Sequence, residues 1–390
     1  MNSLSKKEKK VRASHLALII AFVGTIAVFF LLLCFLPKHE GELSPNERRL
    51  LAKAPTITLE NIASGNFGKE VDTWLEDHFP LRNFFVASYA YMNHYFGKNA
   101  VESVIMGDED RLFNAPTQVD ESSINKNASK IEEFIEKSGL DAELVIIPSA
   151  GSVMTDSLPK LRLEYHDREM LSIFFDTCTA DGIDIEELFT GTGDIGSMYY
   201  RTDHHLTMKG SYTVYRALCE RLGLTPFAEE EFTKRSFDFY GTVYGTSGLM
   251  LTSPDTMEIW EKDGDSEISV SVFDGTNESN YMGMLDESCL EESYVDRYAC
   301  YLYSNHGLTV IENPNAEQDR TLLVLKDSYG NAIVPFLARH YSRIVMVDTR
   351  YYAGIKDTPS ELAEQYGIDE FVVIYGTDSI NSDISIAWLR

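Results

Sequence analysis

The sequence is poor in positive charge. It has 34 lysine and arginine residues against 61 aspartate and glutamate residues, and its formal net charge is -27. The first 36 residues are net basic, so the acidic excess lies in the rest of the chain. A body this acidic repels phosphate groups, which argues against a nucleic acid partner and against binding to anionic lipid headgroups. We interpret the charge as a solvated surface that keeps the body soluble.

Cysteine is also scarce. Cys34 lies in an apolar run near the N-terminus, and the other four are spread along the body without any Cys-x-x-Cys pair: Cys178, Cys219, Cys289 and Cys300. This spacing argues against a thiolate zinc site. Four cysteines in an exported body allow two disulfides, one of them closing the small loop between Cys289 and Cys300, and they equally allow free thiols. We expect no metal ion and no cofactor.

One apolar segment is long enough to cross a membrane. Residues 16–36 carry no charge, and about 20 such residues span the hydrocarbon core as a helix. A cleaved signal peptide usually has a shorter apolar region and small residues at its cleavage site, whereas residues 33–36 are Leu-Cys-Phe-Leu. The basic cluster at residues 6–12 should stay in the cytoplasm. We therefore predict a single-pass cell membrane protein with a cytoplasmic segment at 1–14, a transmembrane signal-anchor at 15–36, a tether at 37–60 and an extracytoplasmic domain at 61–390.

Apolar strands alternate with helices along the body. Residues 144–149 and 321–327 are largely apolar, which is typical of strands that are buried on both faces of a sheet. Further strands are predicted at 183–185, 344–347 and 371–375, and helices at 123–138, 158–179, 207–222, 331–340 and 359–366. This alternation predicts an α/β fold with a parallel sheet flanked by helices.

Three stretches depart from that alternation. Residues 67–96 are rich in aromatic side chains and should form two helices broken at Pro80, which we expect to pack onto the main domain. Residues 104–113 read as two short strands joined by a turn. Residues 230–315 contain several glycines and alternating segments, and we predict that they form an irregular, antiparallel insertion in the α/β domain.

Ser328 is the candidate nucleophile. It follows the predicted strand 321–327 and precedes a predicted helix, so it should lie at the mouth of the sheet. A serine hydroxyl needs an adjacent base, usually histidine, and a carboxylate that orients this base. Asp203 and His205 lie in a predicted loop before a helix, where the carboxylate can turn toward the ring two residues on. An Asp-x-His sequence is also common without any catalytic role, so these residues alone leave both interpretations open.

Two further residues are candidates for binding the substrate. The backbone N–H of Tyr329 begins the turn into a helix and is the expected donor to an oxyanion, with Gly241 or Gly248 as a possible second donor. Arg350 follows the strand 344–348 at the same edge of the sheet as Ser328. It can bind an anionic or carbonyl group of a substrate, or pair structurally with an acid.

Several of these stretches together resemble the DHHW protein family. The strongest block is Tyr-Arg-Thr-Asp-His-His-Leu-Thr at 200–207, followed by Gly210. Residues 326–331 and 348–352 resemble later blocks of the family, and residues 44–50 and 77–82 resemble N-terminal motifs. One departure is that Leu206 stands where the family's name has tryptophan, which leaves the Asp-x-His pair intact. The family is similar to the SGNH-type alginate O-acetyltransferases of exported polysaccharide machinery.

The resemblance implies a function and a set of roles. It implies Asp203 as the orienting carboxylate, His205 as the base and Ser328 as the nucleophile, with an SGNH-like fold. The leading hypothesis is a membrane-anchored serine O-acyltransferase, with acetyl as the expected group, or an esterase, acting on cell-surface polysaccharide. A transferase also implies a membrane partner that passes acyl groups outward. The alternatives are a non-catalytic SGNH-like protein that binds a glycan or an envelope partner, and a metal-dependent phosphoesterase using Asp203-His204-His205.

Overall fold

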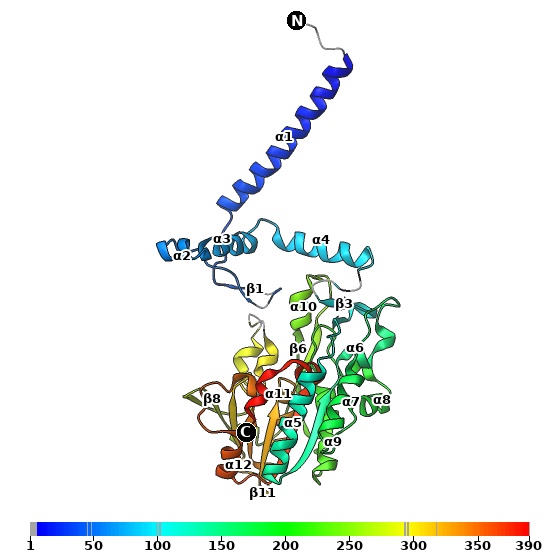
Figure 1. Ribbon diagram of the computed structural model, residues 1–390, viewed down its shortest axis with the longest axis vertical. Coiled ribbons are helices and arrows are strands. Elements are labelled where there is room, and N and C mark those ends of the chain that lie inside the picture. The colour runs from blue at the N-terminus through cyan, green and yellow to red at the C-terminus, as the bar shows by residue number, and fades with distance from the viewer. Residues whose placement is uncertain are drawn as a thin grey trace. The chain divides into compact units, whose positions relative to one another are not determined.

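The chain divides into two units. The structure is a computed structural model that describes residues 6–389 except 45, 48, 99, 101–102, 292–293, 295 and 317. The units are Met1–Met92 and Asn93–Arg390 (Figure 1). The division leaves the aromatic segment before residue 92 in the first unit. Pro45 and Arg48 of the motif at 44–50, and residues 1–5 of the predicted cytoplasmic segment, lie outside the described residues.

The first unit contains one long apolar helix. This helix, α1 (Lys6–Phe35), includes a stretch from Lys10 to Phe35 that is long and apolar enough to cross a membrane. Its length and composition fit either a signal-anchor or a signal peptide. Shorter elements follow, namely β1 (Leu43–Ser44), β2 (Arg49–Leu50), α2 (Leu59–Ala63), α3 (Asn66–Asp77) and α4 (Arg82–Tyr95).

Ion pairs join the two N-terminal motifs. The Asp77 carboxylate accepts hydrogen bonds from Arg49 Nη1 at 2.9 Å and from the backbone N–H of Ala52 at 2.7 Å. The hydrogen bond from Arg49 is the main reason why the pKa of Asp77 falls to about 2. Arg82 pairs with Glu47 in the same way. These ion pairs therefore hold the segment 44–50 against the segment 77–82.

A seven-stranded sheet forms the centre of the second unit. Its strand order is β5-β13-β11-β12-β10-β8-β9. The first four strands are parallel, and the last three are antiparallel to their neighbours. The parallel strands are β5 (Asp141–Ile147), β13 (Glu370–Gly376), β11 (Gln318–Lys326) and β12 (Tyr341–Val347), and the others are β10 (Leu308–Glu312), β8 (Ser269–Asp274) and β9 (Asn277–Met282). The sheet is therefore mixed, and the α/β fold expected from the sequence is confirmed.

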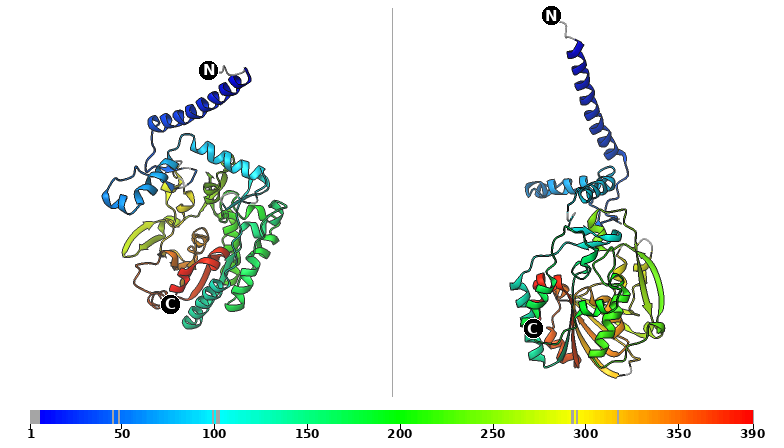
Figure 2. Two further views of the ribbon diagram at one scale, coloured as in Figure 1. Left: turned by 45° about the horizontal axis from the view of Figure 1, so that its top comes forward. Right: turned by 90° about the vertical axis from the view of Figure 1, so that its right-hand side faces the viewer.

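Helices cover both faces of this sheet. Leu322 and Val324 of β11 belong to one core cluster, while Leu323 and Leu325 belong to another, because successive side chains of a strand point to opposite faces. One face packs against α5 (Glu121–Ser138), α7 (Asp167–Thr177), α12 (Pro359–Tyr366) and α13 (Thr377–Ser382). The other packs against α8 (Ile185–Gly191), α9 (Met208–Arg221) and α11 (Gly330–Leu337). The right-hand view of Figure 2 shows helices on either side of the strands. This double cover explains why the parallel strands are apolar on both faces.

The region 230–315 is antiparallel, as predicted, but it is only partly separate from the sheet. Its strands β6 (Thr233–Phe239) and β7 (Asp255–Glu261) form a two-stranded sheet around α10 (Thr242–Ser247). Its strands β8, β9 and β10 instead extend the central sheet. Outside this region, β3 (Val104–Met106) and β4 (Leu112–Asn114) form the predicted pair, and α6 (Ala150–Val153) follows β5.

Three local predictions were wrong. Residues 183–185 are not a strand, because the Asp184 side chain accepts a hydrogen bond from Glu187 N and caps the start of α8. The helix predicted at 158–179 is limited to α7. The aromatic residues of 67–96 do not form a core: Asp77 and Ala90 are the buried residues of α3 and α4.

All five cysteines are described, and each is a free thiol. Cys34 is exposed and the other four are buried. Burial raises the pKa of the Cys289 thiol to about 11. Of the two possibilities that the sequence left open, the structure therefore has the free thiols.

Candidate active site

A tight turn after β11 carries Ser328. The preceding Asp327 is buried, and its Oδ2 accepts hydrogen bonds from Gly376 N and from Ser379 Oγ, each at 2.7 Å. Gly330, which begins α11, approaches Lys326 so closely that an added Cβ would lie 2.7 Å from the Lys326 Cβ. The strand end, the turn and the helix start are thus fixed on both sides of Ser328.

The loop before α9 carries Asp203 and His205. The Asp255 carboxylate anchors this loop by accepting hydrogen bonds from Arg201 N at 2.9 Å, Thr202 N at 2.7 Å and Thr202 Oγ1 at 2.6 Å. A bridge between Tyr199 and Leu206 closes the loop. Leu206, at the position of the family's tryptophan, is itself buried in the core. A leucine therefore fills this packing position.

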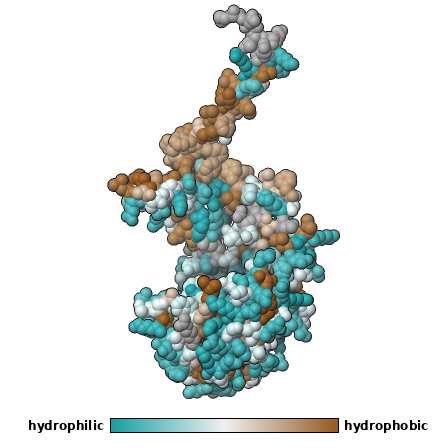
Figure 3. Space-filling model, viewed as in Figure 1, coloured by the Kyte–Doolittle hydropathy of each residue, from teal (hydrophilic) through white to brown (hydrophobic). Residues whose placement is uncertain are grey.

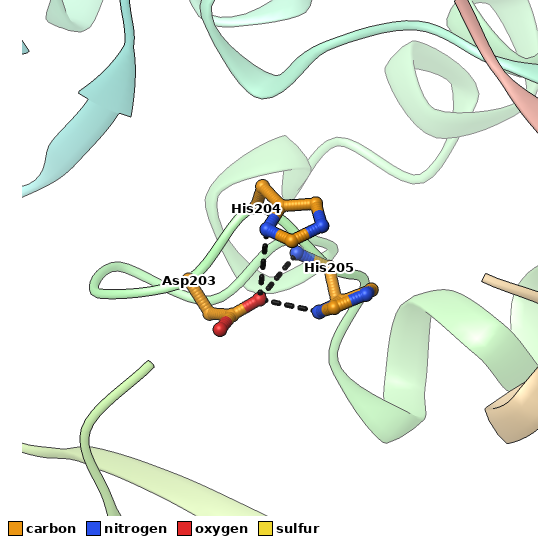
Figure 4. A group of neighbouring side chains, drawn as sticks. All are labelled: Asp203, His204 and His205. Carbon is orange, nitrogen blue, oxygen red and sulfur yellow. Dashed lines mark hydrogen bonds and ion pairs between the residues drawn. The ribbon is translucent and has the colours of Figure 1, made fainter. Parts of the chain in front are cut away.

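A continuous chain of hydrogen bonds runs from Asp203 to Ser328. His205 Nε2 lies 2.8 Å from Ser328 Oγ, and His205 Nδ1 lies 2.5 Å from Asp203 Oδ1. Figure 4 shows Asp203 with His204 and His205, whose rings both face its carboxylate. With the Nδ1–H donating to Asp203, His205 Nε2 is free to accept the serine proton. Asp203, His205 and Ser328, which the sequence suggested as one group, thus lie within hydrogen-bond distance of one another along this chain.

The Asp203 carboxylate is fully buried and fully hydrogen-bonded. Its Oδ1 also accepts from the backbone N–H of His205 at 2.9 Å, and its Oδ2 accepts from Thr242 N at 2.6 Å and Thr242 Oγ1 at 3.1 Å. Burial alone would raise the pKa of Asp203, but the two histidines and the bond from Thr242 N outweigh it and hold this pKa well below its usual value. Asp203 is therefore ionised.

Gly241 serves Asp203 rather than an oxyanion. A Cβ on Gly241 would lie 2.1 Å from the Asp203 Cβ, so no other residue allows this approach. Its N–H donates to Thr202 Oγ1 at 3.0 Å. Gly248 ends α10 in a left-handed conformation, which is a helix-capping position. The expectation that either glycine donates to an oxyanion finds no support in this geometry.

Tyr298 is a site residue that sequence reasoning missed. Its ring stacks on the His205 ring, with the centroids 3.9 Å apart and the planes inclined by 11°. Its hydroxyl donates to the backbone carbonyl of Ser328 at 3.2 Å. Tyr298 belongs to a short 3-10 turn, Arg297–Cys300, inside the irregular region, and no local signal marks it. The region that looked like an insertion therefore supplies one wall of the site.

His204 lies beside the hydrogen-bonded chain. Its Nδ1 is 2.9 Å from Thr242 Oγ1 and 3.4 Å from Asp203 Oδ1, and its ring centroid is 3.8 Å from that of His205. Its side chain is about one third exposed, at 34%. Within the described residues, Asp203, His204 and His205 are the one acidic and histidine cluster whose ligand atoms lie close enough to share a metal ion.

The backbone N–H of Tyr329, which the sequence suggested as the oxyanion donor, already has an acceptor within the protein. It donates to Asp327 Oδ1 at 2.9 Å, so in this structure it is engaged within the turn, and the expectation from sequence needs correction. The Tyr329 hydroxyl donates to the carbonyl of His204 at 2.9 Å, which joins the turn that carries Ser328 to the loop that carries Asp203 and His205. No described residue accepts a hydrogen bond from the N–H of Ser328 itself.

Arg350 is held by a buried acid and borders the same cavity as Ser328. Its Nε and Nη2 donate to the two oxygens of Asp348 at 2.9 Å and 2.7 Å. Asp348 also pairs with the Lys326 ammonium at 3.2 Å, and both of these side chains are almost completely buried. The cavity has a volume of about 190 Å³, and its lining includes Ser149, Ser328 and Arg350. Arg350 therefore pairs structurally with an acid and also lines the cavity beside Ser328.

Comparisons with known proteins agree with this fold. Two solved structures share it. The crystal structure of a DHHW family protein from Eubacterium siraeum has a TM-score of 0.61 at 21% identity, covering 74% of this chain and 95% of that chain. Bacillus cereus PatB1, solved with a sulfonyl adduct, has a TM-score of 0.63 at 19% identity, covering 74% of this chain and 98% of that chain. No curated protein matches the chain.

Two family models match parts of the chain. Residues 104–242 match the model described as SGNH hydrolase-like domain, acetyltransferase AlgX. The chain thus carries an SGNH hydrolase-like, AlgX-type domain. Residues 182–347 match the model described as DHHW protein, and the chain is a DHHW family protein.

Proposed function

We propose that this protein is a membrane-anchored, extracytoplasmic serine O-acyltransferase or esterase that acts on cell-surface polysaccharide. The single observation that carries the proposal is the 2.8 Å distance between His205 Nε2 and Ser328 Oγ, in line with the Asp203 carboxylate on the other side of the ring. The SGNH-like O-acyltransferase relationship of the domain supports the reaction class, and the AlgX-type domain supports a polysaccharide as the substrate.

The reaction proceeds in two half-reactions through an acyl-serine. Ser328 Oγ attacks the carbonyl carbon of an acyl donor while His205 Nε2 takes the hydroxyl proton. That proton passes to the leaving group as the donor's carbon–oxygen bond breaks. A sugar hydroxyl then attacks the acyl-serine, gives its proton to Nε2, and Ser328 Oγ recovers a proton as it leaves. Water in place of the sugar gives the esterase reaction.

Three groups of the site stabilise the charges that develop. Asp203 holds the histidine tautomer and balances the imidazolium that forms. The N–H of Ser328 is the oxyanion donor that we propose, because that of Tyr329 is engaged by Asp327. Arg350 borders the cavity and binds an anionic or carbonyl group of the substrate, held in place by Asp348.

We place the reaction outside the cell. The apolar helix α1 acts as an uncleaved signal-anchor, and the basic cluster before it keeps the N-terminus in the cytoplasm. An acyl donor must then reach the outer side, so we propose a membrane partner that passes acyl groups across. The acidic body disfavours nucleic acid as a partner.

Acyl-enzyme formation tests the proposed reaction. The purified full-length protein in detergent, mixed with p-nitrophenyl acetate, should release a stoichiometric burst of p-nitrophenolate followed by slow turnover. Oligosaccharide acceptors should speed the turnover of a transferase. Ser328→Ala should abolish the burst. Ser149→Ala is the matched control, because Ser149 lines the same cavity and its hydroxyl is buried without a partner among the described residues.

The other two candidate functions give different results in this assay. A non-catalytic glycan-binding or partner-binding protein shows no burst although it is folded. A metal-dependent phosphoesterase is favoured by one observation, the close ligand atoms of Asp203, His204 and His205. A metal there would have to displace the 2.5 Å bond between His205 and Asp203. Loss of activity on chelation, and recovery with metal, would favour that function over ours.

A further inference from the structure

Exposed apolar side chains are concentrated in one part of the first unit. Among the residues that the structure describes, twelve large apolar side chains are exposed between residues 37 and 92, as many as between residues 93 and 389. The first of these segments is about one fifth as long as the second, so its density of exposed apolar groups is about five times higher. Soluble surfaces rarely gather such groups, and their gathering marks a surface that contacts a protein or a membrane.

Helix α4 carries much of this surface. At about 100° per residue, the exposed large apolar side chains Phe84, Phe85, Tyr89 and Met92 of α4 lie within an arc of about 140°. Leu81 is 62% exposed, Phe84 is 64% and Met92 is 57%. Ala90, the one buried residue of α4, lies on the opposite side of the helix. We define the α4 face as the exposed residues Phe79, Leu81, Phe84, Phe85, Tyr89 and Met92. On a soluble protein the apolar side of a surface helix is normally buried, whereas the apolar side of α4 is exposed.

The α4 face is continuous with the helix that we propose as the anchor. Phe29 of α1 stacks on Phe79 with centroids 5.4 Å apart and an angle of 12°, and it lies 5.9 Å from the Phe85 ring. Figure 3 shows apolar colour running from α1 onto the adjoining helices of the first unit. The apolar surface of α1 therefore does not end where the helix ends.

The depth of this contact identifies the partner. Phe29 lies seven residues before Leu36, where the apolar run ends, which is about 10 Å along the helix. Amphipathic helices that lie in a bilayer interface bury their apolar side to a depth of about 5–10 Å. The rings that touch Phe29 thus lie at about the depth to which such interfacial helices bury their apolar side.

The charge of this segment is compatible with a membrane surface. Residues 37–92 contain eight acidic and six basic side chains, whereas residues 93–390 contain 52 and 23. Arg82 is the one residue of α4 with a permanent charge, and it pairs with Glu47. The strongly acidic surface lies elsewhere, so the α4 face can enter a lipid interface without bringing unpaired charge with it.

We propose that the α4 face lies in the interfacial layer of the bilayer that α1 enters. The first unit is then held by a spanning helix and by a helix that lies in the membrane plane. This inference rests on the anchor that we proposed above, and on no part of the proposed chemistry.

Tryptophan fluorescence of the full-length chain in phosphatidylcholine vesicles tests the proposal. Phe84→Trp places a reporter on the α4 face, and Lys69→Trp places the matched control on the exposed polar side of α3. The emission of the parent chain, which has three tryptophans, is subtracted. We expect phospholipids brominated high on the acyl chain to quench the reporter of Phe84→Trp and to leave that of Lys69→Trp bright, while aqueous acrylamide does the opposite.

Each other outcome overturns the proposal. Quenching of the Phe84→Trp reporter by acrylamide would place the α4 face in water. Shielding from both quenchers would show that protein covers it, either the second unit or a second copy of the chain. The intact mass of the membrane-bound protein tells failure of the anchor from failure of this proposal. A chain that has lost α1 refutes both the anchor and this proposal. A full-length chain whose reporter is exposed to water refutes this proposal alone.

Discussion

Replacing Asp348 by asparagine is expected to destabilise the second unit strongly. Asp348 is completely buried between the ammonium of Lys326 at 3.2 Å and the guanidinium of Arg350 at 2.7 Å. Burial alone would raise the pKa of Asp348, but the two cations hold it below its usual value, so the native carboxyl is charged. The amide keeps the shape and removes the charge.

The size of the effect follows from the group that is left behind. In Asp348→Asn the uncompensated buried charge is that of Lys326, whose ammonium keeps hydrogen bonds to the amide oxygens of Asn331 at 2.7 Å and Asn305 at 3.1 Å. Removing one partner of a buried ion pair costs about 3–5 kcal/mol. The double variant Lys326→Met with Asp348→Asn removes both charges and should recover about 2 kcal/mol or more of that loss.

Urea unfolding of the full chain in detergent, followed by circular dichroism, measures this difference. The matched control is Glu312→Gln, which breaks an ion pair with Arg343 between β10 and β12, where the side chains are 54% and 35% exposed. An exposed pair of this kind is worth about 0–1 kcal/mol. If Asp348→Asn costs no more than Glu312→Gln, or if the double variant is no more stable than Asp348→Asn, our account of this buried pair is wrong.

Three further predictions concern the site and its pH dependence. Asp203→Asn should lower kcat for p-nitrophenyl acetate by about 10⁴-fold, because an amide favours the wrong histidine tautomer, and a loss below about tenfold would contradict the role of Asp203. Tyr298→Leu removes the stack on His205 and should cost about 0.5–1.5 kcal/mol of transition-state stabilisation, measured as a loss of kcat/KM. Tyr298→Phe keeps the stack and should retain most of the activity. Equal losses in the two variants would refute the stacking role. Burial and the nearby Arg339 lower the pKa of His340 to about 4 in the folded protein. As the pH drops, the histidine of the unfolded state therefore takes up a proton before that of the folded state does. The free energy of unfolding should accordingly fall between about pH 6.5 and pH 4. Allowing for its partial exposure, the loss should be about 2 kcal/mol in urea titrations and should be absent in His340→Gln.

The parallel core was predictable from sequence because its signal is local. Each residue of β11 from Thr321 to Lys326 is buried, and a strand covered on both faces must be apolar nearly throughout. Helix α12 likewise begins at Pro359 after the Thr358 cap, both of which are visible in the sequence. The prediction at 183–185 failed because one capping carboxylate at Asp184 outweighed two flanking isoleucines.

The candidate site was predictable only where its residues are chemically distinctive. Asp203, His205 and Ser328 stand out by type and by their place beside predicted elements. Thr242, Gly241 and Tyr298 do not, because their roles depend on a loop from a distant part of the chain approaching Asp203 and His205. The direction of the Tyr329 N–H was also beyond sequence, since it depends on how the Asp327 side chain folds back over the turn.

The exposed aromatic residues of α4 show a different limit. Periodicity correctly indicates an amphipathic helix, but it does not say whether the apolar side meets protein or lipid. We expected these helices to pack onto the main domain, and the structure leaves Phe84 and Met92 exposed.

Mapping the residue that a fluorophosphonate probe modifies tests the central claim most directly. The claim is that Ser328, activated by His205 at 2.8 Å, is the nucleophile. We predict that mass spectrometry of the labelled, full-length protein finds the probe on Ser328, with labelling lost in Ser328→Ala, strongly slowed in His205→Ala and unchanged in Ser149→Ala. Modification of another residue, or no labelling of folded protein, would contradict it.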